Sequence, residues 1–217
     1  MNRYPPLPQA LGRLYTLNRY WKSRQKMMGV PPIEERGEAY RLDGRLDFWL
    51  SLVERLGPPQ GQVIEIGCSP GVLLAELQRR GYECIGVEPD ARVAKWIHNR
   101  VGVEVRKGLF PSVELPSCDL FLALDVPEHV PDPGAFWEAI SRLLRPGGTA
   151  ILQTPVERHD YEHPFKARPD FFDGVEHLFL YTDRSVRRLA ESARLEMVCL
   201  EDAPGTLGQI CVLRKPQ

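Results

Sequence analysis

The sequence of 217 residues lacks the features that mark several special classes of protein. No apolar run approaches the roughly 20 residues of a membrane-spanning helix, and the N-terminus has no apolar core of signal-peptide length. The 28 Lys and Arg residues are balanced by 29 Asp and Glu residues, which excludes a chain that is basic throughout. No two of the five cysteines have the C-x-x-C spacing typical of zinc sites and redox motifs. We therefore expect a cytoplasmic protein with no membrane span and with reduced thiols.

The composition is that of an ordinary globular protein, with 43% hydrophobic and 26% charged residues. The length predicts one domain with an extension: a basic, helical extension over 1–59 and a domain over 60–217. Residues 1–33 carry basic and aromatic side chains but no acid. Three interpretations of this arm stay open. It binds a polyanion, or Leu11, Leu14, Tyr15 and Trp21 form a helix that closes over a bound ligand, or the arm is solvated or packs on the domain.

From about residue 62 the sequence alternates between short apolar runs and helical patterns. The apolar runs predict strands at 63–66, 84–87, 101–105, 120–124, 149–153, 196–200 and 209–213. Helices are predicted at about 34–56, 71–80, 89–100, 132–144 and from Thr182 or Asp183 to 193, with a turn at 145–148. This alternation predicts an α/β fold with a doubly wound, mostly parallel sheet and helices on both faces. The pattern lapses at about 155–181, which is typical of a functional segment.

The segment that carries chemistry is Val63-Ile64-Glu65-Ile66-Gly67-Cys68-Ser69-Pro70-Gly71-Val72, where a strand ends in a tight turn and a helix begins. Gly67 allows a ligand to approach the backbone closely, Gly71 permits unusual dihedral angles, and the helix N-terminus offers unpaired N–H groups. We expect a ligand here, beyond the carboxyl end of the strand. The dinucleotide fingerprint requires glycine where Ser69 and Val72 stand, and the Gly-Lys-Ser/Thr of a nucleotide-triphosphate loop is absent.

This segment resembles motif I of the class I S-adenosylmethionine-dependent methyltransferases, with Ser69 where the family usually has Gly. Further motifs carry the resemblance: Glu88 at the end of the second strand, Asp125-Val126-Pro127-Glu128-His129 after the fourth, and Pro146-Gly147-Gly148 before the fifth. Glu176-His177-Leu178-Phe179 is similar to the ubiquinone-biosynthesis-type branch, which is rich in small-molecule O-methyltransferases. The resemblance covers about 60–214. It implies a Rossmann-like sheet of seven strands, the last antiparallel, and a segment near 155–181 that covers the substrate.

The resemblance also implies a site for S-adenosylmethionine, which is released as S-adenosylhomocysteine. Glu88 is expected to hold both ribose hydroxyls, because a carboxylate accepts two hydrogen bonds. Glu65 is expected to neutralise the amino-acid part of the cofactor, with a salt bridge inside the protein as the alternative. Leu109 or Phe110 is expected to pack the adenine, because the Asp or Asn of many relatives is absent here. The other predicted cofactor contacts are Gly67, Cys68, Ser69, Gly71, Pro89, Leu124 and Asp125. For Asp125 a loop-capping role is equally open.

The reaction that the resemblance implies is the in-line transfer of a methyl group from a sulfonium to an acceptor. His129 is the candidate general base, because it follows the fourth strand and histidine titrates near neutrality. A helix-capping or loop-orienting role is its alternative. Glu128 and His177 are the other candidate catalytic residues. These three side chains have the donor types for a divalent ion, as in some relatives, but no metal is expected.

The sequence therefore predicts a methyltransferase that acts on a small molecule, with oxygen favoured as the acceptor atom. The Asn-Pro-Pro-aromatic signature of many amino-group methyltransferases is absent, which disfavours nucleic acid as a substrate. Two rival interpretations stay open. One is an NAD-dependent oxidoreductase in which Glu88 holds a nicotinamide ribose, and the other is a non-catalytic module that binds S-adenosylmethionine.

Overall fold

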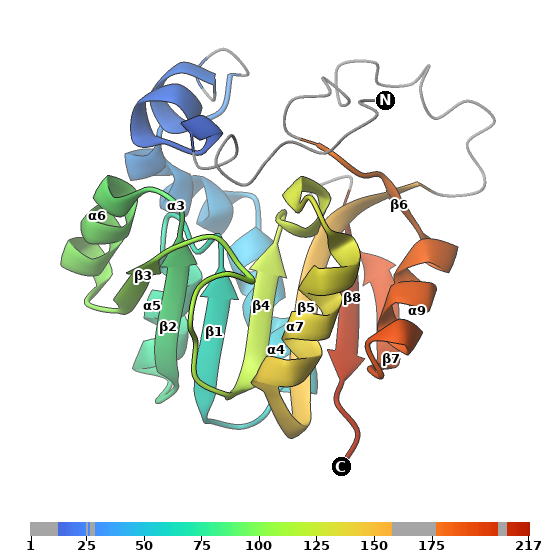
Figure 1. Ribbon diagram of the computed structural model, residues 1–217. Coiled ribbons are helices and arrows are strands. Elements are labelled where there is room, and N and C mark those ends of the chain that lie inside the picture. Colours follow the sequence, from blue (N-terminus) through green and yellow to red (C-terminus); the bar gives the residue numbers. More distant parts are fainter. Residues whose placement is uncertain (1–12, 25, 27–28, 158–176, 204–207) are drawn as a thin grey trace.

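The computed structural model describes residues 13–24, 26, 29–157, 177–203 and 208–217. Its centre is a sheet with the strand order β3-β2-β1-β4-β5-β8-β7 (Figure 1). The parallel strands are β3 (Glu104–Lys107), β2 (Glu83–Glu88), β1 (Gln62–Ile66), β4 (Cys118–Leu124) and β5 (Leu144–Glu157). The last strand, β8 (Gly208–Arg214), lies antiparallel between β5 and β7 (Glu196–Asp202). The predicted mostly parallel sheet of seven strands, with the last antiparallel, is confirmed. The described residues add β6 (Tyr181–Thr182), which pairs with the end of β5.

Helices cover both faces of the sheet, because the central strands are buried on both sides. One face packs against α4 (Arg45–Leu56), α5 (Val72–Arg79) and α6 (Ala91–Val101), in an apolar cluster that includes the buried side chains of Leu50, Leu74 and Ile97. The other face packs against α7 (Pro133–Leu143) and α9 (Asp183–Ser192), in a cluster that includes Phe136 and Val186. The predicted α/β layering is therefore confirmed.

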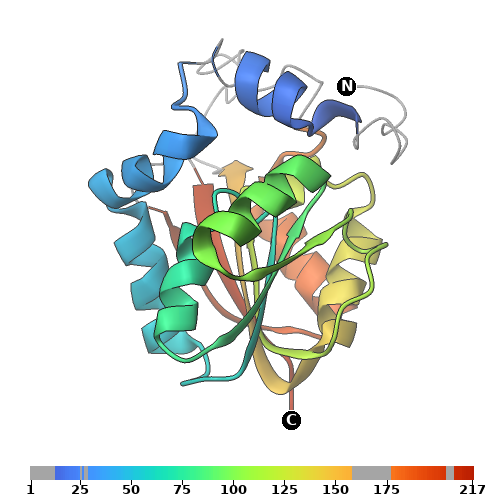
Figure 2. The same ribbon diagram turned by 90° about the vertical axis from the view of Figure 1, so that its left-hand side faces the viewer.

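The carboxyl ends of the parallel strands meet at one edge of the sheet, and the N-terminal part of the chain lies over that edge. Figure 2 shows η1 (Leu17–Arg24), blue at the top, above the strand ends, with α3 (Ile33–Leu42) beside it. The backbone N–H of Leu17 donates to Asp90 Oδ2 at 2.7 Å. Asp90 also caps α6, since its side chain accepts from the N–H of Arg92. The N-terminal segment is thus fastened to the loop that follows β2.

The prediction of one helix over 34–56 is wrong, because the chain forms two helices there. Gly44 has φ +80°, the left-handed conformation that glycine adopts without a steric penalty. The chain turns at this glycine, so that α3 ends at Leu42 and α4 begins at Arg45. The turn lets α3 reach the strand ends while α4 packs against the sheet.

Two boundaries near glycines also differ from the prediction. The strand expected at 101–105 begins only at Glu104, because Val101 still belongs to α6 and Gly102 ends that helix at φ +73°. The turn expected at 145–148 lies inside β5, where the pairing with β4 shifts register. The predicted cap of the last helix is confirmed: Thr182 and Ser185 form a capping box at α9. Most of the expected covering segment, 158–176, lies outside the described residues.

Candidate functional site

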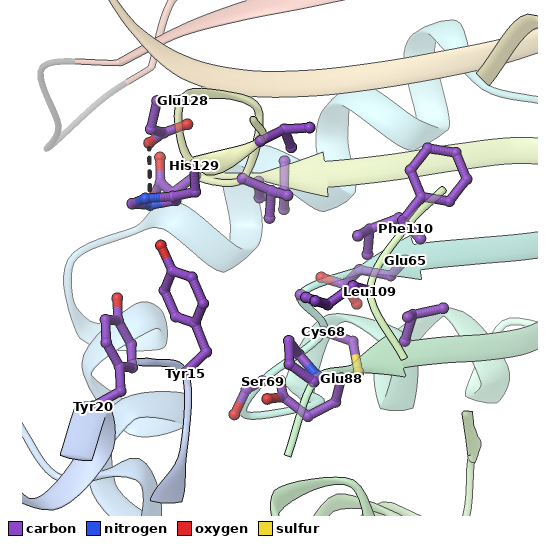
Figure 3. A pocket seen from close by; sticks show the side chains of 18 of the residues that line it. Tyr15, Tyr20, Glu65, Cys68, Ser69, Glu88, Leu109, Phe110, Glu128 and His129 are labelled. Atoms are coloured by element: carbon purple, nitrogen blue, oxygen red, sulfur yellow. Dashed lines mark ion pairs between the residues drawn. The ribbon is translucent and has the colours of Figure 1, made fainter. Parts of the chain in front are cut away.

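A cavity of about 760 Å³ lies at the carboxyl ends of β1, β2 and β4, beneath η1 (Figure 3). This volume is in the range of small-molecule and cofactor sites. The predicted cofactor and catalytic residues all line it: Glu65, Gly67, Cys68, Ser69, Gly71, Glu88, Pro89, Leu109, Phe110, Leu124, Asp125, Glu128, His129 and His177. The structure therefore brings together residues that are spread over more than 100 positions of the sequence.

The turn between β1 and α5 forms one wall of the cavity, and two glycines shape it. Gly67 has φ +67°, and a Cβ atom at this position would lie only 2.7 Å from Cγ2 of Val126. Gly71 has φ +85° and is the N-cap of α5. Larger residues would strain this turn, so its shape leaves room for a ligand against the backbone. Ser69, which departs from the family pattern, keeps the turn intact, and its buried Oγ has no hydrogen-bond partner among the described residues.

Two buried acids stand at the strand ends. Glu65 is 6% exposed and Glu88 is 3% exposed. Burial raises the pKa of Glu65 to about 8, and burial, together with the nearby charge of Asp90, raises the pKa of Glu88 to about 8. Glu65 Oε2 has no hydrogen-bond partner among the described residues, and none of these residues forms a salt bridge with Glu65. The alternative of an internal salt bridge is therefore not supported. Buried acids in this state fit a ligand that brings an ammonium group and hydroxyl donors.

Phe110 takes part in the core as well as in the cavity wall. Its ring centroid lies 5.3 Å from the ring centroids of both Phe121 and Phe136. The ring is therefore fixed by α7 and β4, and together with Leu109 it gives the cavity an apolar wall beyond the end of β3.

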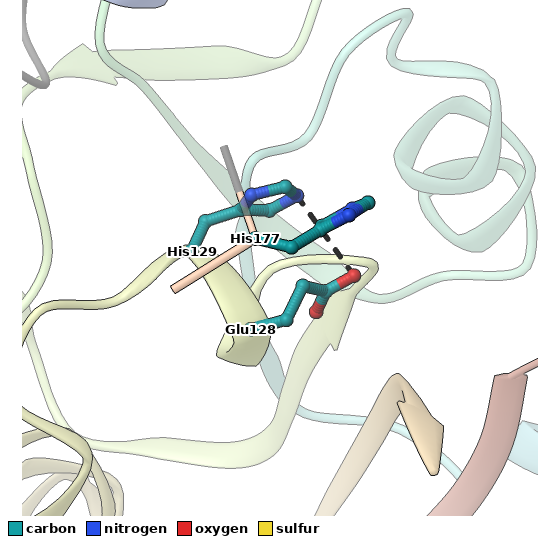
Figure 4. Close-up of side chains that lie close together, drawn as sticks. All are labelled: Glu128, His129 and His177. Carbon is teal, nitrogen blue, oxygen red and sulfur yellow. Dashed lines mark ion pairs between the residues drawn. The ribbon is translucent and has the colours of Figure 1, made fainter. Parts of the chain in front are cut away.

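Three candidate catalytic residues form a cluster (Figure 4), and Figure 3 shows two of them, Glu128 and His129, at the opposite end of the cavity from Glu88. Glu128 and His129 belong to the short helix η2 (Pro127–His129), and His177 lies in the segment that leads to β6. The rings of His129 and His177 are stacked with centroids 4.9 Å apart. His129 Nε2 lies 3.8 Å from Glu128 Oε1, and Glu128 Oε2 accepts a hydrogen bond of 3.0 Å from Thr154 Oγ1.

The protonation states in this cluster follow from its burial. Burial and the neighbouring His177 lower the pKa of His129 to about 3, so that this imidazole is neutral at physiological pH. Its contact with Glu128 is therefore not an ion pair at that pH. The expectation that His129 titrates near neutrality is wrong for the free protein. Burial, together with the charge of Asp125, raises the pKa of Glu128 well above its ordinary value. The ligand atoms of Glu128, His129 and His177 lie within 4.8 Å of one another, which is close enough to hold one divalent ion.

The N-terminal segment provides a second wall of the cavity, whose residues were not among the predicted site residues. This wall consists of Tyr15, Tyr20, Trp21, Arg36, Tyr40 and Arg45. The ring of Tyr15 meets His129 edge-on with centroids 5.6 Å apart, and the guanidinium of Arg45 lies 4.3 Å from the ring centre of Tyr40. The aromatic residues of the arm were the signal for this wall, and their position agrees with the interpretation that the arm closes over a ligand.

Comparison with known proteins identifies the family. A family model described as a methyltransferase domain matches residues 40–200. The chain belongs to this family. The predicted methyltransferase family is thereby confirmed, and S-adenosylmethionine is the cofactor of this class.

The curated relatives include a ubiquinone biosynthesis O-methyltransferase from Hahella chejuensis, 30% identical over 118 residues, which are 51% of this chain and 48% of the relative. An uncharacterized methyltransferase from Mycobacterium sp. strain KMS is 36% identical over 116 residues, 51% of this chain and 44% of the relative. The chain thus spans about half the length of the curated relatives that it matches.

Solved structures share the fold at low sequence identity. Geranyl diphosphate C-methyltransferase from Streptomyces coelicolor has a TM-score of 0.70 at 16% identity, covering 84% of this chain and 83% of the other. Magnesium protoporphyrin IX methyltransferase from Synechocystis has a TM-score of 0.66 at 14% identity, covering 82% and 86%. Among the described residues, every helix is too short or too polar to cross a lipid bilayer.

Proposed function

We propose that the protein transfers the methyl group of S-adenosylmethionine to an oxygen atom of a small-molecule acceptor. The observation that carries this proposal is the pair of buried acids, Glu65 and Glu88, at adjacent strand ends of one cavity. Glu65 receives the amino group of the cofactor, and Glu88 receives the ribose hydroxyls. Arg45 lines the cavity, and its donors that are not bonded to Asp43 receive the cofactor carboxylate.

The bound cofactor supplies an electrophilic methyl group on a sulfonium, and the protein aligns the acceptor with it. Leu109 and Phe110 pack the adenine. His129 is neutral at physiological pH and can therefore accept a hydrogen bond from an acceptor hydroxyl. His177 supports the His129 ring by stacking. Water is kept from the reaction by the aromatic wall of the N-terminal segment.

Two observations favour oxygen and a small molecule. The cavity volume suits a cofactor together with a compact acceptor, and several curated relatives are named as O-methyltransferases of ubiquinone biosynthesis. Structural neighbours at low identity include a C-methyltransferase, which makes carbon the second candidate atom. Nucleic acid is not proposed as a substrate. The five cysteines are all free thiols, which supports a reducing compartment such as the cytoplasm.

The proposal is tested first by calorimetric titration with S-adenosylhomocysteine, with NAD in parallel. Micromolar binding of S-adenosylhomocysteine alone is the expected result, and binding of NAD alone would contradict the proposal. A screen of phenols, carboxylic acids and activated carbon acids with radiolabelled cofactor then identifies the acceptor atom. Binding without methylation of any acceptor would support the non-catalytic module instead.

The catalytic cluster is tested with His129→Ala and His177→Ala, and His98→Ala serves as the matched control because His98 does not line the cavity. A general base contributes about 100-fold or more to a rate. We expect a loss of that size in kcat for His129→Ala, a smaller loss for His177→Ala, and unchanged affinity for S-adenosylhomocysteine in both. Equal rates for His129→Ala and His98→Ala would exclude His129 from the reaction.

A further inference from the structure

Asp125 has an unusual backbone and two bonds to the same partner. It follows β4 directly and has φ +57°, a left-handed conformation that few residues other than glycine adopt. Its backbone N–H donates to the carbonyl oxygen of Gln153 at 2.9 Å, and its Oδ1 accepts from Gln153 Nε2 at 2.8 Å. Aspartate is among the few residues that do adopt it, and the two bonds to Gln153 hold Asp125 in place. Asp125 lines the cavity and is exposed to it.

Gln153 lies on β5 and is completely buried at 0% exposure. Its Oε1 accepts a hydrogen bond of 2.8 Å from Trp49 Nε1. An indole N–H can only donate, so this bond fixes which end of the Gln153 amide faces Trp49. The Nε2 end must then face Asp125, which receives it as an acceptor.

Trp49 anchors this chain of bonds in the apolar core. It lies on α4, is 5% exposed, and meets Tyr40 edge-on with ring centroids 5.2 Å apart. A buried glutamine at the core face of a central strand is costly unless both ends of its amide are bonded. An apolar residue would fill the same place without that requirement. We therefore take the function of the hydrogen bonds from Trp49 to Gln153 and from Gln153 to Asp125 to be the support of the Asp125 carboxylate.

Asp125, at the open end of this series of hydrogen bonds, lines the same cavity as the catalytic cluster. Asp125 interacts electrostatically with the charged and titratable groups of Arg36, Arg45, Tyr20, Tyr40, Glu128 and His177. We propose that Gln153, anchored by Trp49, is a positioning residue that holds Asp125 so that its carboxylate receives the acceptor beside His129. This rests on the proposed methyl transfer. It places Asp125 on the acceptor side of the cavity instead of among the cofactor contacts.

The kinetic test compares Gln153→Met with Gln153→Glu in the full-length protein. Gln153→Met removes the bond to Asp125, and a hydrogen bond to a charged group is worth about 10-fold or more. We expect that loss in acceptor kcat/KM at every pH, with the affinity for S-adenosylhomocysteine kept within about two-fold. Gln209→Met is the matched control, because Gln209 is a buried glutamine of the same sheet that does not line the cavity. Its kinetics should match the wild type.

Gln153→Glu keeps the shape of the side chain and gives a signature that a merely structural role would not give. At low pH the introduced carboxyl carries a proton, donates to Asp125 and restores the wild-type bond. As the pH rises, that proton is lost and two like charges face each other, so activity should fall. Activity of Gln153→Glu that follows the wild-type pH profile would overturn the proposal, and so would an activity of Gln153→Met equal to that of Gln209→Met.

A second measurement needs no acceptor. The indole ¹⁵N–¹H signal of Trp49 is assigned from its disappearance in Trp49→Phe. In Asp125→Asn, which tolerates the left-handed backbone, we expect this signal and the side-chain amide signals of Gln153 to shift, because the three groups are linked by hydrogen bonds. Unchanged signals would overturn the linkage. If the wild type binds S-adenosylhomocysteine but methylates nothing, the proposed function fails and with it the acceptor role of Asp125, while the spectrum alone decides the linkage.

Discussion

Replacing Glu65 by glutamine should stabilise the free protein at alkaline pH and weaken cofactor binding at the same time. The opposite signs arise because Glu65 is buried without a hydrogen-bonding partner for Oε2 among the described residues, while the cofactor is expected to provide one. A buried acid of this kind is unfavourable for folding and useful only when the ligand is present.

The size of the effect follows from the pKa. Burial raises the pKa of Glu65 from 4.5 to about 8. The folded state thus binds a proton that the unfolded state has already lost, so stability is greatest below pH 4.5 and falls as the pH rises toward 8. The loss is roughly 3 kcal/mol at pH 7. A glutamine with an unbonded amide costs about 1–3 kcal/mol at all pH values. The variant should therefore be less stable than the wild type at pH 5 and more stable at pH 8.

The assay is thermal unfolding of both proteins at pH 5 and pH 8, without cofactor. The difference in unfolding free energy should change by about 3 kcal/mol between the two pH values, or about 6–12 °C in Tm for a chain of this size. Glu76→Gln is the control, because Arg79 and Arg41 lower the pKa of Glu76 from 4.5, so that its Tm difference from the wild type should stay nearly constant between pH 5 and pH 8. Tm differences that stay constant between pH 5 and pH 8 would refute the reasoning.

Cofactor affinity is the second half of the same prediction. Titration of Glu65→Gln with S-adenosylhomocysteine should give a Kd raised about 10-fold or more, the usual loss for a hydrogen bond to a charged group. An unchanged Kd would mean that Glu65 does not contact the cofactor, even if the stability result holds.

Three further results are expected. Because the pKa values of both Glu65 and Glu88 are about 8 in the free protein, S-adenosylhomocysteine should bind more tightly as the pH rises from 6 to 8 and should release protons, which calorimetry in buffers of different ionisation enthalpy measures. Gly67→Ala should lower the unfolding free energy by about 1–3 kcal/mol, since its φ is +67° and its Cβ would lie 2.7 Å from Cγ2 of Val126; a denaturant midpoint equal to that of the wild type would contradict this. Treatment with EDTA should change the methyl-transfer rate less than two-fold, because the raised pKa of Glu128 makes a proton compete with any metal; loss of activity that Mg²⁺ restores would reverse that expectation.

The residues on the cofactor side of the cavity could be predicted from the sequence, because they follow strands that the local hydrophobic pattern indicates. Glu65, Gly67 and Glu88 each stand at or beside the end of an apolar run, and parallel strands bring such ends together. The same reasoning failed where glycine reverses the chain. At Gly44 the helical pattern continues through a residue whose backbone is left-handed, and periodicity alone does not register this break.

Contacts between distant residues were beyond such reasoning. Trp49 and Gln153 are separated by 104 positions, and nothing near either residue indicates the other. Tyr15 meets His129 only because η1 folds back over the strand ends. The sequence showed that the arm is rich in aromatic residues. Whether these residues face a ligand depends on how α3 packs against the rest of the chain, which the local pattern does not show.

The end of β5 has a consequence for how this site can change during evolution. Gln153 and Thr154 are neighbours on that strand and point to opposite faces, where one holds Asp125 and the other holds Glu128. Substitution can alter either acid's support separately. An insertion or deletion of one residue in β5 would exchange the two faces and leave both acids without their partners. Because β5 is paired on both sides, by β4 and β8, the strand cannot slip to absorb such a change. Diversification of this enzyme should therefore proceed by point substitutions at the strand end and by length changes elsewhere.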